Sequence, residues 1–219
     1  KQTFDSYNDF FTRKIRAEER PVNPDANALV SPSDGKVSVY KIHENGHFLI
    51  KHTEYTLEQL LQDKKLAKRY LDGYIYVIRL TVDDYHRYCY AADGRKSEQR
   101  KIAGILHTVN PVANDVCPIY KMNSREYCMI KTEQFGTLLQ MEVGALMVGK
   151  ISNNQQGVGF VHKGVEKGRF EFGGSTIILL TQKNVVISDR DLLEHTGSGM
   201  ETLVKMGEQI GRSANRLDA

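Results

Sequence analysis

The second half of the chain is a succession of short apolar or alternating runs, each closed by a glycine or by an Asn/Asp cluster. Runs of this length and punctuation predict β-strands rather than helices. The predicted strands beyond Ala92 span residues 101–109, 118–121, 126–131, 136–148, 159–162, 177–180 and 185–188. So many strands beside one clear helix indicate an α+β, mainly β fold: antiparallel sheets in a sandwich-like or barrel-like arrangement with a few helices.

The first half of the chain adds three strands and that one helix. The strands span residues 37–42, 47–50 and 74–82. The helix is predicted from Leu57 to Leu71, since a capping box at Thr56–Gln59 opens it and leucines follow at helical spacing. Gly73 is expected to end it. The tail at 200–212 holds another short amphipathic stretch whose type the sequence leaves open.

Residues 4–20 mix aromatic and basic side chains. Phe4, Tyr7, Phe10 and Phe11 recur at helical spacing, which predicts one apolar helix face, and Pro21 then breaks the helix. Such a face usually packs on the protein's own core; the alternative is that it lies on a lipid surface. The sequence alone leaves both interpretations open.

Composition limits the classes of protein. At 219 residues and 24.9 kDa the chain suits a single domain, 1–219, with its own core. A net charge of +3 is too small to argue for a nucleic-acid partner, and it is compatible with an anionic membrane. The three cysteines are odd in number and lack metal-ligand spacing, which favours a reducing compartment and no metal site. No run has the length of a transmembrane helix, and no signal peptide is visible.

Chemistry is suggested by the stretch that ends in Gly173-Gly174-Ser175-Thr176. Two glycines allow a tight turn, and residues 176–180 form a short apolar strand, so Ser175 lies where a bend meets a buried strand. A hydroxyl in that position can attack the peptide bond before it, giving an ester. Elimination from the ester would leave dehydroalanine and then a pyruvoyl group at a new N-terminus. The plain alternative is a hairpin turn that carries a polar residue.

Two further segments carry candidate residues. Asp34 lies in the turn Ser31-Pro32-Ser33-Asp34-Gly35, where a turn-capping carboxylate is the simple interpretation. Residues 83–90 follow a predicted buried strand and are dense in titratable side chains, including His86 and Cys89. Such a segment suits a catalytic loop, and a solvated hairpin tip is the alternative.

Taken together, these stretches resemble the phosphatidylserine decarboxylase family, a group of pyruvoyl-dependent enzymes. The resemblance covers nearly the whole chain. It rests on Asn8-Asp9-Phe10-Phe11-Thr12-Arg13, Ser31-Pro32-Ser33-Asp34-Gly35, Asp84-Tyr85-His86-Arg87, Val109-Asn110-Pro111, Asn123 with Arg125, Glu142-Val143-Gly144-Ala145 with Val148-Gly149, and Lys163 through Phe170 leading into Phe172-Gly173-Gly174-Ser175-Thr176. Each motif is weak alone, and their joint occurrence in this order is specific.

The resemblance implies that a proenzyme cuts itself between Gly174 and Ser175, giving a large chain, 1–174, and a small chain, 175–219. Ser175 would become the pyruvoyl cofactor, and Asp34 would belong to the self-processing site. The implied reaction converts phosphatidylserine to phosphatidylethanolamine and CO2, with the pyruvoyl group as electron sink. His86 is the candidate for proton transfer at Cα, with a structural histidine as the alternative.

The aromatic and basic mix of residues 4–16 further leads us to expect a peripheral protein at an anionic membrane surface, on the cytoplasmic side of the cell membrane. A homodimer is compatible with the resemblance. Two alternatives keep the family and change the function. One is a soluble pyruvoyl-dependent decarboxylase of a free amino acid. The other is a relative that folds but is never processed.

One position departs from the family pattern. The motif usually continues Asp-Tyr-His-Arg-x-His, and its second histidine pairs with the aspartate to activate the serine. This chain has Cys89 there. An unperturbed thiol, with a pKa of about 8.5, is mostly protonated at neutral pH, and a neighbouring carboxylate would raise that pKa further. We therefore expect His86, oriented by Asp34, to act as the base for self-processing, with Cys89 filling space. A Cys89 thiolate as base is the alternative.

Overall fold

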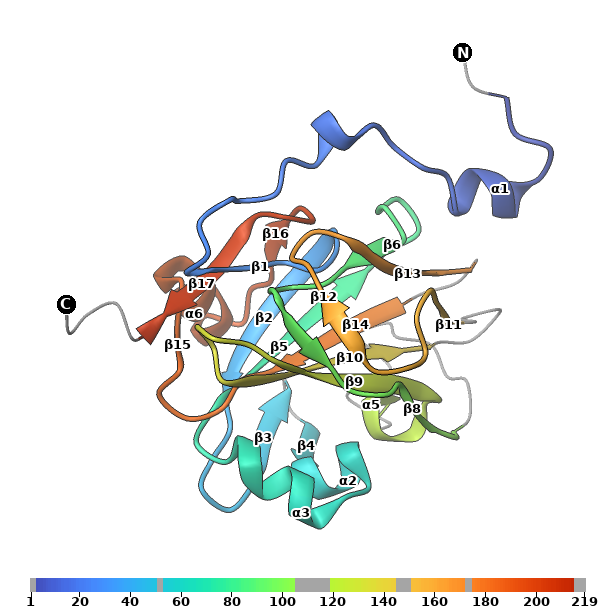
Figure 1. Cartoon of the computed structure of the whole chain (residues 1–219). Helices are drawn as coiled ribbons and strands as arrows, with labels where there is room; N and C mark the ends of the chain where they lie inside the picture. Colours follow the sequence, from blue (N-terminus) through green and yellow to red (C-terminus); the bar gives the residue numbers. More distant parts are fainter. Residues whose placement is uncertain (1–2, 51–52, 105–118, 145–150, 172–174, 215–219) are drawn as a thin grey trace.

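A nine-stranded antiparallel sheet runs through the middle of the protein (Figure 1). The computed structural model describes residues 3–50, 53–104, 119–144, 151–171 and 175–214. In spatial order the sheet consists of β12 (Gly159–Val161), β7 (Gly94–Lys96), β9 (Arg125–Lys131), β10 (Thr137–Val143), β14 (Ser175–Leu180), β5 (Tyr74–Leu80), β2 (Gly35–Lys41) and β16 (Thr202–Val204), with β8 (Arg100–Ile102) also paired to β9. Its central strand β14 is buried along its whole length.

Side chains of β14 alternate between the two faces of this sheet, as they must in any strand. Ile178 and Leu180 point to one side, which we call the hairpin face. This face is covered by β3 (His47–Ile50), β4 (Thr53–Thr56), α2 (Leu57–Leu61), α3 (Lys64–Ala67), the 3₁₀ helix η2 (Lys68–Tyr70) and α5 (Ile119–Met122). These elements gather below the sheet in Figure 1.

Ile177 and Leu179 point to the other side, which also carries Ser175 and which we call the Ser175 face. Two three-stranded sheets and one helix cover it. They are β1 (Ala28–Val30), β17 (Gln209–Ser213) and β15 (Val186–Ser188), then β11 (Ile151–Asn153), β13 (Glu166–Phe170) and β6 (Arg87–Cys89), and α6 (Arg190–Gly197). The predicted α+β, mainly β class is thus confirmed, and the described strands stack as a sandwich rather than closing into a barrel.

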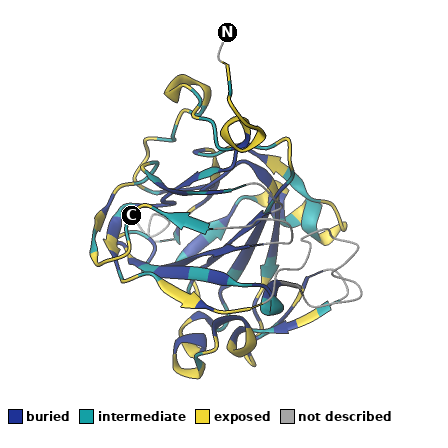
Figure 2. Cartoon of the chain, turned by 90° about the vertical axis from the view of Figure 1, so that its right-hand side faces the viewer, coloured by how far each residue is buried: buried dark blue, intermediate teal, exposed yellow. Residues whose placement is uncertain are grey.

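The N-terminal segment before β1, residues 3–27, crosses the molecule as a largely exposed stretch that we call the arm (Figures 1 and 2). The predicted long helix over residues 4–20 is wrong. Only α1 (Tyr7–Phe11) forms, and a 3₁₀ turn, η1 (Ala17–Glu19), follows it. Arg87 explains the early end, because its guanidinium takes the backbone carbonyls of Thr12 and Arg13 at 2.9 and 3.3 Å between N and O. Further helical turns would need those carbonyls.

The predicted helix from Leu57 to Leu71 is also broken. Thr56 caps its start as expected, accepting from the backbone N–H of Gln59. Gln62 then adopts a left-handed conformation, with φ of 50°, and Asp63 caps a new helix by accepting from Leu66. A capping side chain within the predicted helix therefore divides it into α2 and α3, and α3 leads directly into η2.

Other predictions divide in the same way. Strands expected at 37–42, 47–50, 74–82, 126–131, 159–162, 177–180 and 185–188 are confirmed within a few residues. The strand expected at 118–121 is wrong, since residues 119–122 are helical, and most of the predicted strand at 101–109 lies outside the described residues. The tail at 200–212 holds β16 and β17, while α6 was not predicted. Among the described residues, no helix is long and apolar enough to span a membrane.

Candidate active site

Ser175 is the first residue of β14 and is fully buried. It pairs with Leu80 of β5, and its side chain lies on the Ser175 face. Its Oγ is buried and makes no hydrogen bond within the part of the chain that the structure describes. The predicted cleavage partner Gly174 lies outside the described residues. A buried hydroxyl without a partner is costly, so it calls for an explanation, of which a catalytic role is one.

The residues on either side of the predicted cleavage bond, Phe170 and Ser175, pair with residues at the two ends of the β5–β6 connection. At one end the N–H of Phe170 donates to the carbonyl of His86 at 2.9 Å between N and O. At the other, Ser175 pairs with Leu80. The fold therefore brings the predicted serine and the predicted histidine segment together at one end of the sheet.

His86 is fully buried beneath the N-terminal arm. Its Nδ1–H donates to the carbonyl of Asp84 at 2.9 Å, and its Nε2 has no hydrogen-bond partner among the described residues. The ring of Phe11 lies on the imidazole, with 3.8 Å between ring centroids. Burial lowers the pKa of His86 to about 4, so at neutral pH the ring is uncharged and Nε2 is free to accept a proton.

Asp34 is buried and its carboxylate is already occupied. Arg20 of the arm donates from Nε to Oδ1 at 2.7 Å and from Nη2 to Oδ2 at 2.5 Å, and the N–H of Met206 donates to Oδ1 at 2.9 Å. Within the described residues, neither His86 nor Ser175 hydrogen-bonds to this carboxylate. The structure therefore does not show the expected orientation of His86 by Asp34. Arg20 is a site neighbour that the sequence analysis missed.

Cys89 lies where the family pattern would place its second histidine, against the turn that carries Asp34. Its N–H donates to the carbonyl of Pro32 at 2.8 Å, and its Sγ is 4.0 Å from the carbonyl oxygen of Ser31. The side chain is fully buried, and burial raises the pKa of its thiol to about 12. At neutral pH Cys89 is thus a protonated thiol, a property that disfavours the thiolate alternative.

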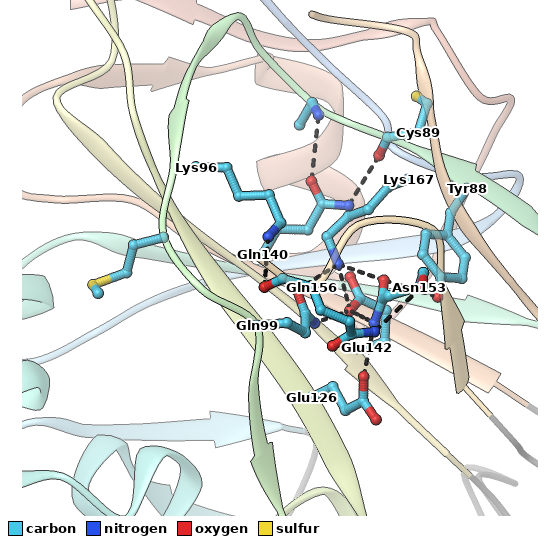
Figure 3. A network of polar contacts seen from close by, with 12 residues as sticks. Tyr88, Cys89, Lys96, Gln99, Glu126, Gln140, Glu142, Asn153, Gln156 and Lys167 are labelled. Carbon is cyan, nitrogen blue, oxygen red and sulfur yellow. Dashed lines mark hydrogen bonds and ion pairs between the residues drawn. The ribbon is translucent and has the colours of Figure 1, made fainter. Parts of the chain in front are cut away.

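A network of buried polar side chains lies on the same face of the sheet and was not predicted (Figure 3). At its centre the ammonium of Lys167, in β13, donates to Glu142 Oε2 of β10 at 2.7 Å and to Asn153 Oδ1 at 2.8 Å. Lys167 and Glu142 are both fully buried. The sequence feature that could have indicated this network is a charged residue within a run that otherwise predicts a buried strand, since strands buried on both faces are usually apolar throughout.

Comparison with known proteins gives a consistent result. The family model described as phosphatidylserine decarboxylase matches residues 7–212. A phosphatidylserine decarboxylase proenzyme 2 from Clostridium acetobutylicum is 46% identical over 213 residues, covering 97% of this chain and 72% of the relative. Phosphatidylserine decarboxylase proenzymes from Fusobacterium nucleatum and Clostridium perfringens are each 41% identical, covering 98% and 95% of this chain and 72% and 71% of the relatives.

Proposed function

The chain belongs to the phosphatidylserine decarboxylase family and is a carboxy-lyase; from this we propose that it makes a pyruvoyl group from its own Ser175 and uses it to convert phosphatidylserine to phosphatidylethanolamine and CO2. The observation that carries the proposal is the state of Ser175, which follows Gly173-Gly174 in sequence and begins a buried strand, with a hydroxyl that has no hydrogen-bond partner among the described residues. The family match over residues 7–212 supports it.

The residues present fit a pyruvoyl group at position 175. The group would begin the small chain in a buried environment, and no side chain among the described residues binds the oxygen atom of Ser175 that must leave. Once formed, a pyruvoyl carbonyl supplies an electron sink for loss of CO2 from an amino acid headgroup. The protein's own contribution is to orient the substrate, exclude water and move protons.

Formation of the group can be written with the chain's own atoms. The Oγ of Ser175 loses its proton and bonds to the carbonyl carbon of Gly174. The bond from that carbon to the nitrogen of Ser175 breaks, and the nitrogen takes up a proton. A base takes the Cα proton as the Cβ–Oγ bond breaks, which releases residue 174 as a carboxylate and leaves dehydroalanine at position 175. Cβ then takes up a proton as the amine becomes an imine, and water replaces the imine nitrogen, which leaves as ammonia.

His86 is the candidate for proton delivery during decarboxylation. Its Nε2 has no hydrogen-bond partner in the part of the chain that the structure describes, and the contacts with the carbonyl of Asp84 and the ring of Phe11 fix the imidazole. An uncharged imidazole can take a proton from solvent or substrate and pass it to Cα.

We further place the enzyme at an anionic membrane surface, as a peripheral protein of the cytoplasmic side. The supporting feature is the arm, where Tyr7 and Phe10 are 57% and 44% exposed next to Arg13, whose guanidinium lies 4.6 Å from the Phe10 ring centroid. Exposed aromatic and basic side chains together suit the interface between headgroups and acyl chains.

Intact-mass measurement of the purified protein tests the proposal. We expect two chains, with the smaller covering residues 175–219 and blocked by a pyruvoyl group. CO2 release from phosphatidylserine vesicles should then exceed release from free serine. A protein that stays one chain of 24.9 kDa under assay conditions would contradict self-processing. Equal turnover of free serine would contradict the lipid substrate.

A further inference from the structure

The ion pair between Lys167 and Glu142 is buried in the sandwich, and both side chains have no exposed surface. Taking two charges out of water costs more than their attraction usually returns, so a buried pair is weak evidence for a stabilising role. This pair is also not a closed unit. Gln99, Asn153 and Tyr88 connect to it, and Asn153 extends the network to Glu126 (Figure 3).

The two oxygens of Glu142 differ in their contacts. Oε2 accepts from Lys167 at 2.7 Å, from Gln99 at 3.1 Å and from Asn153 at 3.3 Å. Oε1 is buried and has no hydrogen-bond partner within the described residues. One oxygen is thus held by three donors, and the other keeps its full capacity to accept a hydrogen bond or a proton.

The register of the sheet relates that free oxygen to Ser175. Glu142 of β10 pairs with Ile177 of β14, so both lie on one face, and Ser175 lies on the same face two residues before Ile177. Glu142 and Ser175 are therefore diagonal neighbours, at a typical separation of about 7–8 Å, with their Cβ atoms somewhat closer. Continuing the register by one residue places Gly144 opposite Ser175. Because glycine has no side chain, no β10 side chain stands directly across from the serine.

Other candidate bases are less suited to Ser175. The Cys89 thiol is protonated at neutral pH, and the Asp34 carboxylate is filled by Arg20 and Met206. His86 Nε2 has no hydrogen-bond partner among the described residues, but Nδ1 donates to a backbone carbonyl rather than to a carboxylate, so the ring lacks the hydrogen-bonded carboxylate that stabilises an imidazolium in a triad.

We propose that Glu142, held by Lys167, is the proton acceptor for Ser175 in self-cleavage. It would take the role of the histidine that the family pattern has at the position of Cys89. This inference rests on the proposed self-cleavage. It assigns the first step to Glu142 and leaves His86 for decarboxylation.

In that step Glu142 takes the proton from Oγ of Ser175 as Oγ bonds to the carbonyl carbon of Gly174. The carbon–nitrogen bond then breaks, and the same proton passes to the nitrogen of Ser175, so the carboxylate is regenerated. Ser175 Oγ and Glu142 Oε1 are not hydrogen-bonded to each other in this structure. The transfer therefore needs a rotamer change of Glu142 or one bridging water.

The charged groups around Glu142 suit this role. Lys167 contacts it directly, and Glu126 faces it across the β9–β10 ladder. Burial and, more weakly, Glu126 raise the pKa of Glu142, while Lys167 opposes the rise. A carboxylate with a raised pKa is a stronger base than one in water, and the adjacent ammonium favours its ionised form.

The experiment follows cleavage of freshly synthesised protein over time, for the wild type and for Glu142→Gln, Glu54→Gln and His86→Gln. We expect Glu142→Gln to cleave about 10²–10⁴-fold more slowly, the typical contribution of a positioned base. Glu54→Gln, a control carboxylate of β4 that pairs with His47 on the hairpin face, should cleave within about threefold of wild type, and His86→Gln should cleave but not decarboxylate. Glu142→Asp, which restores a shorter carboxylate, should recover part of the rate.

Because Glu142→Gln leaves a buried ammonium unpaired, a double variant, Glu142→Leu with Lys167→Met, removes both charges. Thermal melting establishes that it folds, and we expect it to remain uncleaved. Either Glu142 variant cleaving at the wild-type rate overturns the assignment to Glu142 and leaves the proposed function standing. A wild type that never cleaves overturns both. If His86→Gln stalls while Glu142→Gln cleaves, the base is His86.

Discussion

The two faces of the central sheet both bury charged side chains, and they treat them differently. On the hairpin face Arg125 is fully buried, and its guanidinium donates to the backbone carbonyls of Leu60, Lys121, Asn123 and Gln59 at 2.8–3.1 Å. On the Ser175 face the charged Glu142 keeps one oxygen, Oε1, without a partner among the described residues, and so do Ser175 Oγ and His86 Nε2. The hydroxyls of Tyr70 and Thr176, which also have no partner in the described part of the chain, show that the hairpin face has such atoms too. The difference therefore lies in the charged groups: every guanidinium nitrogen of Arg125 is hydrogen-bonded, whereas one oxygen of Glu142 can still accept a proton.

The largest expected effect comes from removing the hydroxyl of Ser175. Removing the neighbouring hydroxyl on the other face of the sheet is the control. Ser175→Ala should abolish cleavage and leave a single chain, because no other atom can form the ester. Thr176 is adjacent and equally buried but points to the hairpin face, so Thr176→Val should still cleave. Electrophoresis and intact mass of both variants make the measurement. Cleavage in Ser175→Ala would show that the bond is broken elsewhere.

A second prediction concerns stability on the hairpin face. Arg125→Met should lower the free energy of unfolding by about 3–5 kcal/mol, because it leaves four carbonyls without their donor and loosens α2 from α5. Urea unfolding measures the loss. Whatever fraction folds should still cleave itself. A folded Arg125→Met protein that fails to cleave would contradict the claim that the hairpin face serves stability and the Ser175 face serves cleavage.

The local part of this comparison could be predicted from sequence. The apolar run after Gly173-Gly174 predicted β14 with Ser175 at its start, and that strand is confirmed. Local patterns failed where a distant side chain competes. Arg87 ends α1 by taking carbonyls 74 and 75 residues away in sequence. The break after Gln62 depends on Asp63, which sequence alone placed in the middle of a helix.

The chemistry of the Ser175 face was less accessible to sequence reasoning. Ser175, His86 and Asp34 came from motifs, and their roles stay predictions. Lys167 and Glu142 meet only because β13 folds over β10, and no local sequence pattern predicts that these two strands come together. Arg20 is similar, since it reaches Asp34 only once the arm crosses the molecule. Long-range pairing of charged residues therefore needed the structure.

A third prediction uses pH to examine His86. Burial lowers its pKa to about 4 in the folded protein, against about 6.5 unfolded, so the unfolded chain binds the extra proton between these values. Folding is therefore favoured fully above pH 6.5, and this contribution is lost as pH falls toward 4. Asp84 and Asp34 act against the lowering and Arg13 acts with it.

Urea unfolding at intervals from pH 7 to pH 4 makes the measurement. We expect wild type to lose stability more steeply than His86→Gln, by up to about 1.4 kcal/mol per pH unit. Other titrating groups are common to both proteins and cancel in the difference. Phe11→Ala should reduce that excess slope, because it uncovers the imidazole. Parallel slopes for wild type and His86→Gln would mean that His86 titrates normally and is not sealed beneath the arm.

The smallest expected effect separates neighbouring aromatic residues of the arm. Phe11 is 2% exposed and covers His86, whereas Phe10 is 44% exposed and lies between Phe4, at 5.4 Å between ring centroids, and the guanidinium of Arg13. If the arm rests on lipid, Phe10→Ala should weaken binding to phosphatidylserine vesicles about tenfold, the loss expected from unburying part of one aromatic ring. Arg13→Gln should weaken binding at low salt and matter less at high salt, since salt screens its attraction to headgroups. Co-sedimentation with anionic and neutral vesicles measures both effects.

Phe11→Ala is the control. The ring of Phe11 faces the protein, so this substitution should leave vesicle affinity nearly unchanged. Equal failure of the wild type to bind either kind of vesicle would mean that this arm is not the membrane contact. A loss of binding in Phe11→Ala equal to that in Phe10→Ala would mean that lipid affinity depends on the arm's docking over His86 rather than on its exposed aromatic ring.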